Sequence, residues 1–100
     1  MESANAIIKI TNLRLRTYIG FNQEEKVNKQ DVVINIAIYY PAEKASTTDD
    51  VSDALNYKTV CKKVIQHVEE GRFLLLERLV SDILAIAIDH PWVEKAVVTV

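Results

Sequence analysis

The chain has 100 residues, of which 49% are hydrophobic and 26% are charged, a composition that excludes a disordered or collagen-like chain. Twelve lysines and arginines against fourteen acidic residues give a formal net charge of -2, which leaves no overall basic field for nucleic acid or an anionic membrane. With one cysteine, no secretion signal and no apolar run near the roughly 20 residues of a membrane helix, we expect one domain in the cytoplasm.

Two long strands are predicted in the first half of the chain. Residues 6–20 alternate between apolar and polar side chains after Asn12, which is typical of a half-buried strand. Residues 30–40 alternate more clearly, and Pro41 ends the run. The polar residues 22–29 between them predict a wide connection between antiparallel strands, of a length that often carries function.

Two helices and a third strand are predicted in the second half. Residues 56–70 carry apolar side chains at helical spacing up to Gly71, and residues 75–89 do so up to Pro91. Residues 92–100 alternate again. The order strand, strand, helix, helix, strand predicts a single α+β domain over residues 1–100, with both helices on one face of an antiparallel sheet. The apolar last strand predicts either a further strand or pairing with the sheet edge of another chain.

Few residues could carry chemistry, and each has a structural alternative. Cys61 is expected to be a buried, inert thiol, because it lies on an apolar helix face. His67 and His90 are expected to be structural, because they lie near helix ends. Glu25 and Gln30 lie in the wide connection, either as part of a solvated turn or as functional groups. Glu77 begins an apolar helix, where it either favours the helix N-terminus or accepts two parallel N–H bonds from a heterocycle.

Three segments together resemble the dihydroneopterin aldolase family. Residues 13–20 read Leu-Arg-Leu-Arg-Thr-Tyr-Ile-Gly and are followed by Glu25 and Gln30. Residues 53–57 read Asp-Ala-Leu-Asn-Tyr, and residues 75–79 read Leu-Leu-Glu-Arg-Leu. The segments occur in the family's order and at its distances, and the resemblance covers essentially the whole chain.

The resemblance implies a tunnelling fold, in which a four-stranded antiparallel sheet carries two helices on one face. The last of these four strands would be absent from the 100 residues. In this family, subunits join their sheets edge to edge into tetrameric rings, two of which stack into a homo-octamer. Active sites lie between neighbouring subunits, so one chain would hold only part of a site.

The resemblance also implies roles for individual residues. Glu77 matches the carboxylate that anchors the pterin, with Leu76 and Leu55 as further pterin contacts. Glu25 and Tyr57 match the catalytic glutamate and tyrosine, and Gln30 matches the glutamine beside them. The family's catalytic lysine lies beyond Val100, and Lys95 lies too early in the last strand to take its place. The resemblance implies neither a metal nor a cofactor.

Within the family, residues 14–20, 54–59 and 66–69 are most similar to the branch that epimerises dihydroneopterin triphosphate at C2' by retro-aldol and aldol steps. An aldolase that releases glycolaldehyde and a pterin-binding ring without catalysis are the alternatives. Arg14, Arg16 and Lys29 are candidates for contacts with a triphosphate, or else charges on the solvent face of a strand and in a turn.

Overall fold

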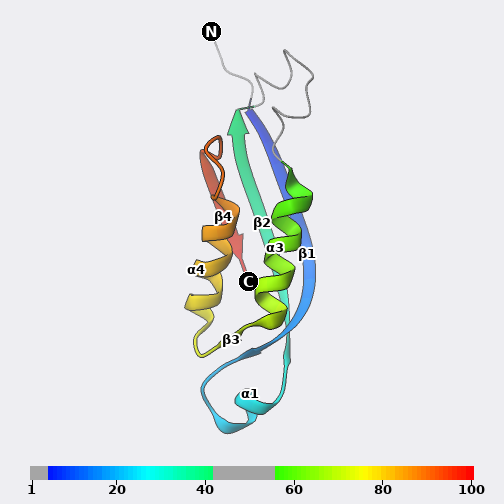
Figure 1. Ribbon diagram of the computed structural model, residues 1–100, viewed down its shortest axis with the longest axis vertical. Coiled ribbons are helices and arrows are strands. Elements are labelled where there is room, and N and C mark those ends of the chain that lie inside the picture. The colour runs from blue at the N-terminus through cyan, green and yellow to red at the C-terminus, as the bar shows by residue number, and fades with distance from the viewer. Residues whose placement is uncertain (1–4, 42–55) are drawn as a thin grey trace.

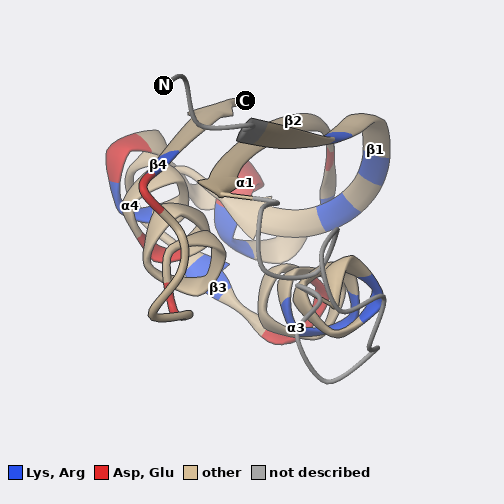
Figure 2. Cartoon of the chain, turned by 90° about the horizontal axis from the view of Figure 1, so that it is seen from above, with Lys and Arg blue, Asp and Glu red and all other residues tan. Residues whose placement is uncertain are grey.

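The computed structural model describes residues 5–41 and 56–100. These residues form seven elements in the order β1 (Asn5–Ile19), α1 (Gln23–Val27), β2 (Gln30–Pro41), α3 (Tyr57–Glu70), β3 (Arg72–Phe73), α4 (Leu76–Ala87) and β4 (Lys95–Thr99) (Figure 1). The predicted α+β class is confirmed, and α3 and α4 lie side by side on one face of the sheet (Figure 2). Sequence reasoning missed the short elements α1 and β3. No helix among the described residues has the length and apolar character needed to cross a membrane.

The sheet is mixed, with the strand order β3-β1-β2-β4. The pairs β1–β2 and β2–β4 are antiparallel, as predicted, whereas β3 pairs in parallel with the end of β1 through Tyr18–Arg72 and Ile19–Phe73. The prediction of a wholly antiparallel four-stranded sheet is therefore wrong for the described residues. The reason is that α3 runs in the same direction as β1, so the chain that leaves α3 meets the end of β1 in parallel (Figure 1).

A bulge near Asn12 explains why alternation begins there in the sequence. The register between β1 and β2 shifts between Ile10 and Leu13, and Asn12 has a positive φ of 55°. Its backbone N–H donates to Oδ1 of Asn35 across the strand pair, at 2.9 Å. Asparagine tolerates this left-handed conformation better than most residues. Beyond the bulge, Leu15 and Thr17 face the helices and are buried.

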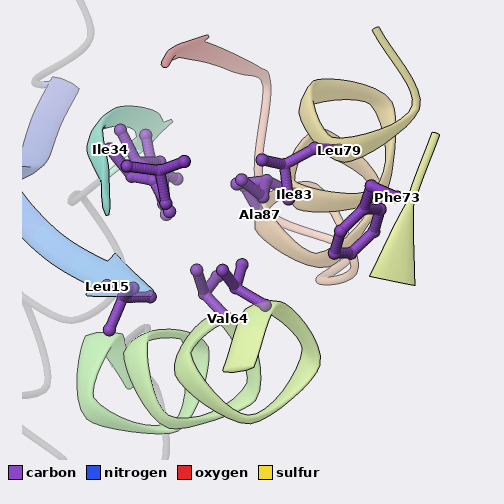
Figure 3. Packing of buried hydrophobic residues seen from close by; sticks show 11 residues of the cluster. Leu15, Ile34, Val64, Phe73, Leu79, Ile83 and Ala87 are labelled. Atoms are coloured by element: carbon purple, nitrogen blue, oxygen red, sulfur yellow. The ribbon is translucent and has the colours of Figure 1, made fainter. Parts of the chain in front are cut away.

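The core lies between β2 and the two helices. Every second residue of β2 is buried, and these side chains meet those of α3 and α4 (Figure 3). The buried hydrophobic residues are Leu15, Val32, Ile34, Ile36, Ile38, Val64, Val68, Phe73, Leu79, Ile83 and Ala87. Burying each of the large aliphatic side chains contributes about 1.5–3 kcal/mol before entropy is subtracted. This packing fixes the helices against the sheet and so sets where their ends lie.

The two ends of α3 are fixed by local interactions. Oδ1 of Asn56 accepts hydrogen bonds from the backbone N–H groups of Lys58 and Thr59, at 3.1 and 3.4 Å, which caps the helix. Gly71 ends the helix, as predicted, but its φ of -85° is not the left-handed stop that a glycine commonly provides. A Cβ atom at Gly71 would overlap the ring of Phe73, so close packing of that ring is what requires glycine here.

Candidate functional site

Most of the candidate residues gather at one end of the molecule, where α1, β3 and the start of α4 meet the end of β1 (Figure 1). Gly20 joins β1 to α1 with a φ of 118°, a conformation that side chains rarely allow. Its backbone N–H donates to the carbonyl of Phe73 at 2.8 Å, which ties the turn to β3. The chain is therefore held from two sides at the point where the wide connection begins.

The carboxylate of Glu25 accepts hydrogen bonds from two groups within this connection, and the backbone N–H of Glu25 donates a third bond. In a capping box at the start of α1, Oδ1 of Asn22 accepts from the Glu25 N–H at 2.9 Å, and the Asn22 N–H donates to Oε1 of Glu25 at 3.3 Å. Nε2 of Gln30 lies 3.4 Å from Oε2 of Glu25 and donates to the carbonyl of Ile19 at 2.7 Å. The structure thus brings Glu25 and Gln30 together, half-buried, rather than leaving them in an open solvated turn.

Gly20 makes room for the Glu25 carboxylate. A Cβ atom at Gly20 would overlap the carboxylate carbon and both of its oxygens. The two residues belong to a hollow of about 240 Å³ that is lined by Tyr18, Gly20, Glu25, Lys26, Arg72, Phe73 and Leu74. A carboxylate of fixed position in a partly enclosed hollow can accept a proton from a bound hydroxyl group and return it, which is the geometry of a general acid and base.

Glu77 and Leu76 lie close to this hollow, in the first turn of α4. The N-cap residue Leu75 makes no side-chain hydrogen bond, and within the described residues Glu77 has no hydrogen-bonding or ionic partner. Leu74, Leu75 and Leu76 are 60%, 51% and 44% exposed, an apolar surface next to a carboxylate without a partner. This combination suits a flat heterocycle with a polar edge, which agrees with the role predicted for Glu77 but does not test it.

A second hollow of about 520 Å³ lies beside the start of α4. It is lined by His67, Gly71, Arg72, Phe73, Leu74, Leu75, Arg78 and Asp82. Arg72, Phe73 and Leu74 line both hollows, so the segment from β3 to the start of α4 lies between the two. Arg72 lines both hollows but was not predicted from the sequence as a site residue. The one feature of the sequence that could have indicated it is its position directly after Gly71, between the two predicted helices.

His67 and Asp82 join α3 to α4 beside the second hollow. Nε2 of His67 lies 2.8 Å from Oδ2 of Asp82, and Nε of Arg78 donates to Oδ1 at 2.9 Å. The hydrogen bond with His67, followed by that with Arg78, lowers the pKa of the Asp82 carboxyl below its ordinary value of 3.8, against the opposing effect of burial. These contacts support the structural role expected for His67. Within residues 5–41 and 56–100, no group of three or more His, Cys, Asp or Glu side chains could hold a metal ion.

Tyr57 lies away from Glu25, at the opposite end of α3 (Figure 1). The 14 residues of α3 span roughly 20 Å at about 1.5 Å per residue. Tyr57 is half exposed and lines a separate hollow of about 690 Å³ together with Lys9, Ile10, Lys58, Cys61, Lys62, Ile65 and Gln66.

Cys61 lines this hollow and is only half-buried, so the prediction of a buried thiol is wrong. Leu55 lies outside the described residues.

The predicted cations lie in different environments. Nε of Arg16 is 3.2 Å from Oδ1 of Asp31, and Nζ of Lys29 lies 5.7 Å from the ring centre of Tyr18. Arg14 is exposed on the sheet face without helices. Lys95 lies in β4 beside the ring of Tyr39, at 5.5 Å, and not near Glu25 in the sheet, because β4 pairs with the far half of β2.

Comparison with known proteins gives three findings. Residues 8–100 match the model of the family FolB, described as dihydroneopterin aldolase. The dihydroneopterin triphosphate 2'-epimerase of Escherichia coli strain K12 is 57% identical over 100 residues, which cover 100% of this chain and 83% of that protein. The dihydroneopterin aldolase of the same strain is 36% identical over 90 residues, 87% of this chain and 74% of that protein.

A solved structure is similar over nearly the same length. The crystal structure of Escherichia coli dihydroneopterin aldolase in complex with neopterin matches with a TM-score of 0.77 and 31% sequence identity. The match covers 93% of this chain and 83% of that one. Both the sequence and the fold therefore lead to the same group of proteins.

Proposed function

The chain belongs to the dihydroneopterin aldolase family, and from this premise we propose that it inverts C2' of 7,8-dihydroneopterin triphosphate, giving dihydromonapterin triphosphate. The observation that carries the proposal is the 57% identity to a dihydroneopterin triphosphate 2'-epimerase over the whole chain, against 36% to an aldolase of the same organism. The protein is then an isomerase of the cytoplasm that acts on a pterin.

The reaction follows from the chemistry of the substrate. Removal of the proton from the 2'-hydroxyl group turns that carbon into an aldehyde as the C1'–C2' bond breaks, and the bonding electrons move into the dihydropterin ring. The aldehyde fragment turns over, and the electrons return from the ring to form a new C1'–C2' bond on the other face of the aldehyde. The 2'-oxygen regains its proton, and C2' has the inverted configuration. The pterin accepts the electrons itself, so these steps need no Schiff base.

Glu25 is the group we assign to this proton transfer. Its carboxylate is held by the Asn22 N–H and by Gln30 at the wall of the hollow beside Gly20. A positioned general acid and base contributes a factor of about 100 to 10,000 in rate. Gln30 keeps the carboxylate in place, and its remaining polar atoms can contact the side chain of the substrate.

Glu77 is the group we assign to the pterin ring. A carboxylate can accept two parallel N–H bonds from the amino-pyrimidinone edge, and the first turn of α4 holds it on a rigid element. The backbone of Leu76 and the side chain of Leu55 would add contacts to the ring. The exposed leucines 74–76 provide an apolar surface for its faces.

Tyr57 requires a second copy of the chain. Because α3 separates it from Glu25 by roughly 20 Å, a site that uses both residues takes them from two subunits. We propose that subunits of a tunnelling fold join their sheets edge to edge, in a homo-octamer of two stacked tetrameric rings. In this assembly residues 1–100 form a single domain in each subunit. The antiparallel sheet of one subunit pairs at its edge with the sheet of the next.

The test compares two substrates. The purified protein is incubated with dihydroneopterin triphosphate and with unphosphorylated dihydroneopterin, and kcat/KM is measured for each. The released two-carbon aldehyde is measured too, which is glycolaldehyde triphosphate from the first substrate and glycolaldehyde from the second. We expect the triphosphate to be preferred and the released aldehyde to be nearly absent. Efficient release of glycolaldehyde from the unphosphorylated substrate would instead establish an aldolase, and binding of both without turnover would establish a pterin-binding ring. Glu25→Gln is expected to lose turnover, whereas its neighbour variant Glu24→Gln is the matched control.

A further inference from the structure

Two cations lie on the ring of Tyr18 at the end of β1. The guanidinium carbon of Arg72 is 4.0 Å from the ring centre, and Nζ of Lys29 is 5.7 Å from it. We call these three residues the Tyr18 cluster. They come from three different parts of the chain: β1, the residue before β2, and β3. The fold therefore brings together two positive charges that are 43 residues apart in the sequence, within the distance typical of cation–π contacts.

Hydrogen bonds hold the guanidinium group of Arg72 and the backbone of Lys29 in place. Tyr18 and Arg72 are directly paired in the parallel ladder between β1 and β3. Nη1 of Arg72 donates to the carbonyl of Lys26 at 3.1 Å, and Nη2 of Arg16 donates to the carbonyl of Lys29 at 3.3 Å. Because Arg72 uses only one of its five N–H groups in this way, most of its hydrogen-bonding capacity remains free.

The charges of the cluster are not neutralised by acidic side chains. Among the described residues, the ion pairs join Arg16 to Asp31 and join Asp82 to both His67 and Arg78. Neither Lys29 nor Arg72 takes part in an ion pair there. Both residues are exposed, so water solvates their charges in the free protein, and a multiply charged anion can replace this water with several charge-assisted hydrogen bonds.

The cluster borders the hollow that holds Glu25. Tyr18 and Arg72 both line this hollow, and Lys26 lies beside them. By contrast, Arg14 precedes Tyr18 by four residues of strand, roughly 13 Å at about 3.3 Å per residue, and Arg16 is paired with Asp31. Of the three cations that the sequence offered for a triphosphate, only Lys29 combines a charge without an ion pair with a contact to Tyr18, which lines the Glu25 hollow.

We propose that Lys29 and Arg72 bind the triphosphate of the substrate and thereby select the phosphorylated pterin. The inference rests on the proposed function, because it takes Glu25 as the group that acts at C2'. The triphosphate is attached at the next carbon, C3', so it must leave the Glu25 hollow within a few ångströms of that carboxylate. The planar guanidinium group of Arg72 can donate two parallel hydrogen bonds to phosphate oxygens. The ammonium group of Lys29 adds a second positive charge near the same Tyr18 ring.

The test separates the two substrates. In Lys29→Gln and in Arg72→Gln, we expect the KM for dihydroneopterin triphosphate to rise about tenfold or more, as for a lost charge-assisted hydrogen bond, while the KM for dihydroneopterin stays within about twofold. Lys63→Gln, at an exposed lysine of α3, is the matched control. Arg72→Lys keeps the charge and is expected to restore part of the affinity. If both substrates lose affinity equally in the glutamine variants, the residues have a structural role and the proposal is wrong.

A second measurement keeps this proposal independent of the epimerase activity. Binding of inorganic tripolyphosphate is measured by calorimetry on the intact protein and on the same variants, at low and at moderate salt. We expect the wild type to bind and the two glutamine variants to bind at least about tenfold more weakly, with affinity falling as salt rises. If the wild type binds tripolyphosphate but inverts no substrate, the proposed function fails and the anion site stands. Equal binding by wild type and variants would overturn the anion site itself.

Discussion

Replacing Gly20 by alanine tests whether the backbone at this residue positions Glu25. The φ of 118° lies in a region that is nearly restricted to glycine, so an alanine there costs about 1–3 kcal/mol of strain. The lower entropy of the unfolded alanine chain makes this loss smaller by up to about 1 kcal/mol. For a chain of 100 residues, each 1 kcal/mol corresponds to about 4–8 °C in Tm, so we expect a measurable but tolerable destabilisation.

The effect of Gly20→Ala on activity is expected to be much larger than its effect on stability. The added methyl group overlaps the Glu25 carboxylate, which must leave its position between Asn22 and Gln30. If Glu25 transfers the proton, moving it costs a factor of about 100 to 10,000 in kcat. Thermal unfolding followed by circular dichroism and turnover of dihydroneopterin triphosphate are measured on the same preparation. A folded variant that retains kcat within about twofold would refute the assigned role of Glu25.

Three further changes test the core, the link between the helices and the pterin anchor. Ile34→Ala removes a fully buried side chain and is expected to cost about 2–5 kcal/mol in chemical denaturation, whereas Val97→Ala, at a residue that is 43% exposed, is expected to cost far less; equal losses would contradict the described core. Asp82→Asn is expected to lower Tm at neutral pH. Because the pKa of Asp82 is lowered in the folded state, its stabilisation is present above 3.8 and is lost as pH falls through the lower folded value, so the Tm difference should shrink in acid; a difference independent of pH would exclude this link. Glu77→Gln is expected to weaken pterin binding, measured by fluorescence titration, about tenfold or more, while Glu70→Gln in the last turn of α3 leaves it unchanged; unaltered binding in Glu77→Gln would leave Glu77 as a helix-terminus residue only.

The long elements could be predicted from the sequence because their periodicity reports burial directly. β2 begins at Gln30 as expected, and α3 and α4 begin within one residue of the predicted starts, because each has a continuous apolar face against the same core. The two-residue strand β3 could not be predicted in this way. It is too short to show a period, and it exists because α3 returns the chain to the end of β1.

The candidate site could be predicted only in part for the same reason. Glu25 and Gln30 are five residues apart, so a local connection was enough to bring them together. Arg72 is an isolated cation between two helices, and its neighbours Tyr18 and Lys29 are known only once the chain has folded. Tyr57 was assigned its role by resemblance, whereas Glu77 was predicted both from its place at the start of an apolar helix and by resemblance; both roles stay predictions.

The central claim is that this protein inverts C2' of a triphosphorylated pterin without releasing the two-carbon fragment. The most direct measurement is chiral chromatography of the pterin after incubation of dihydroneopterin triphosphate with the purified protein and subsequent dephosphorylation. We expect the amount of monapterin formed to equal the amount of neopterin lost, and both epimers to be present at the end of the reaction. Unchanged neopterin, or conversion to 6-hydroxymethylpterin without monapterin, would contradict it.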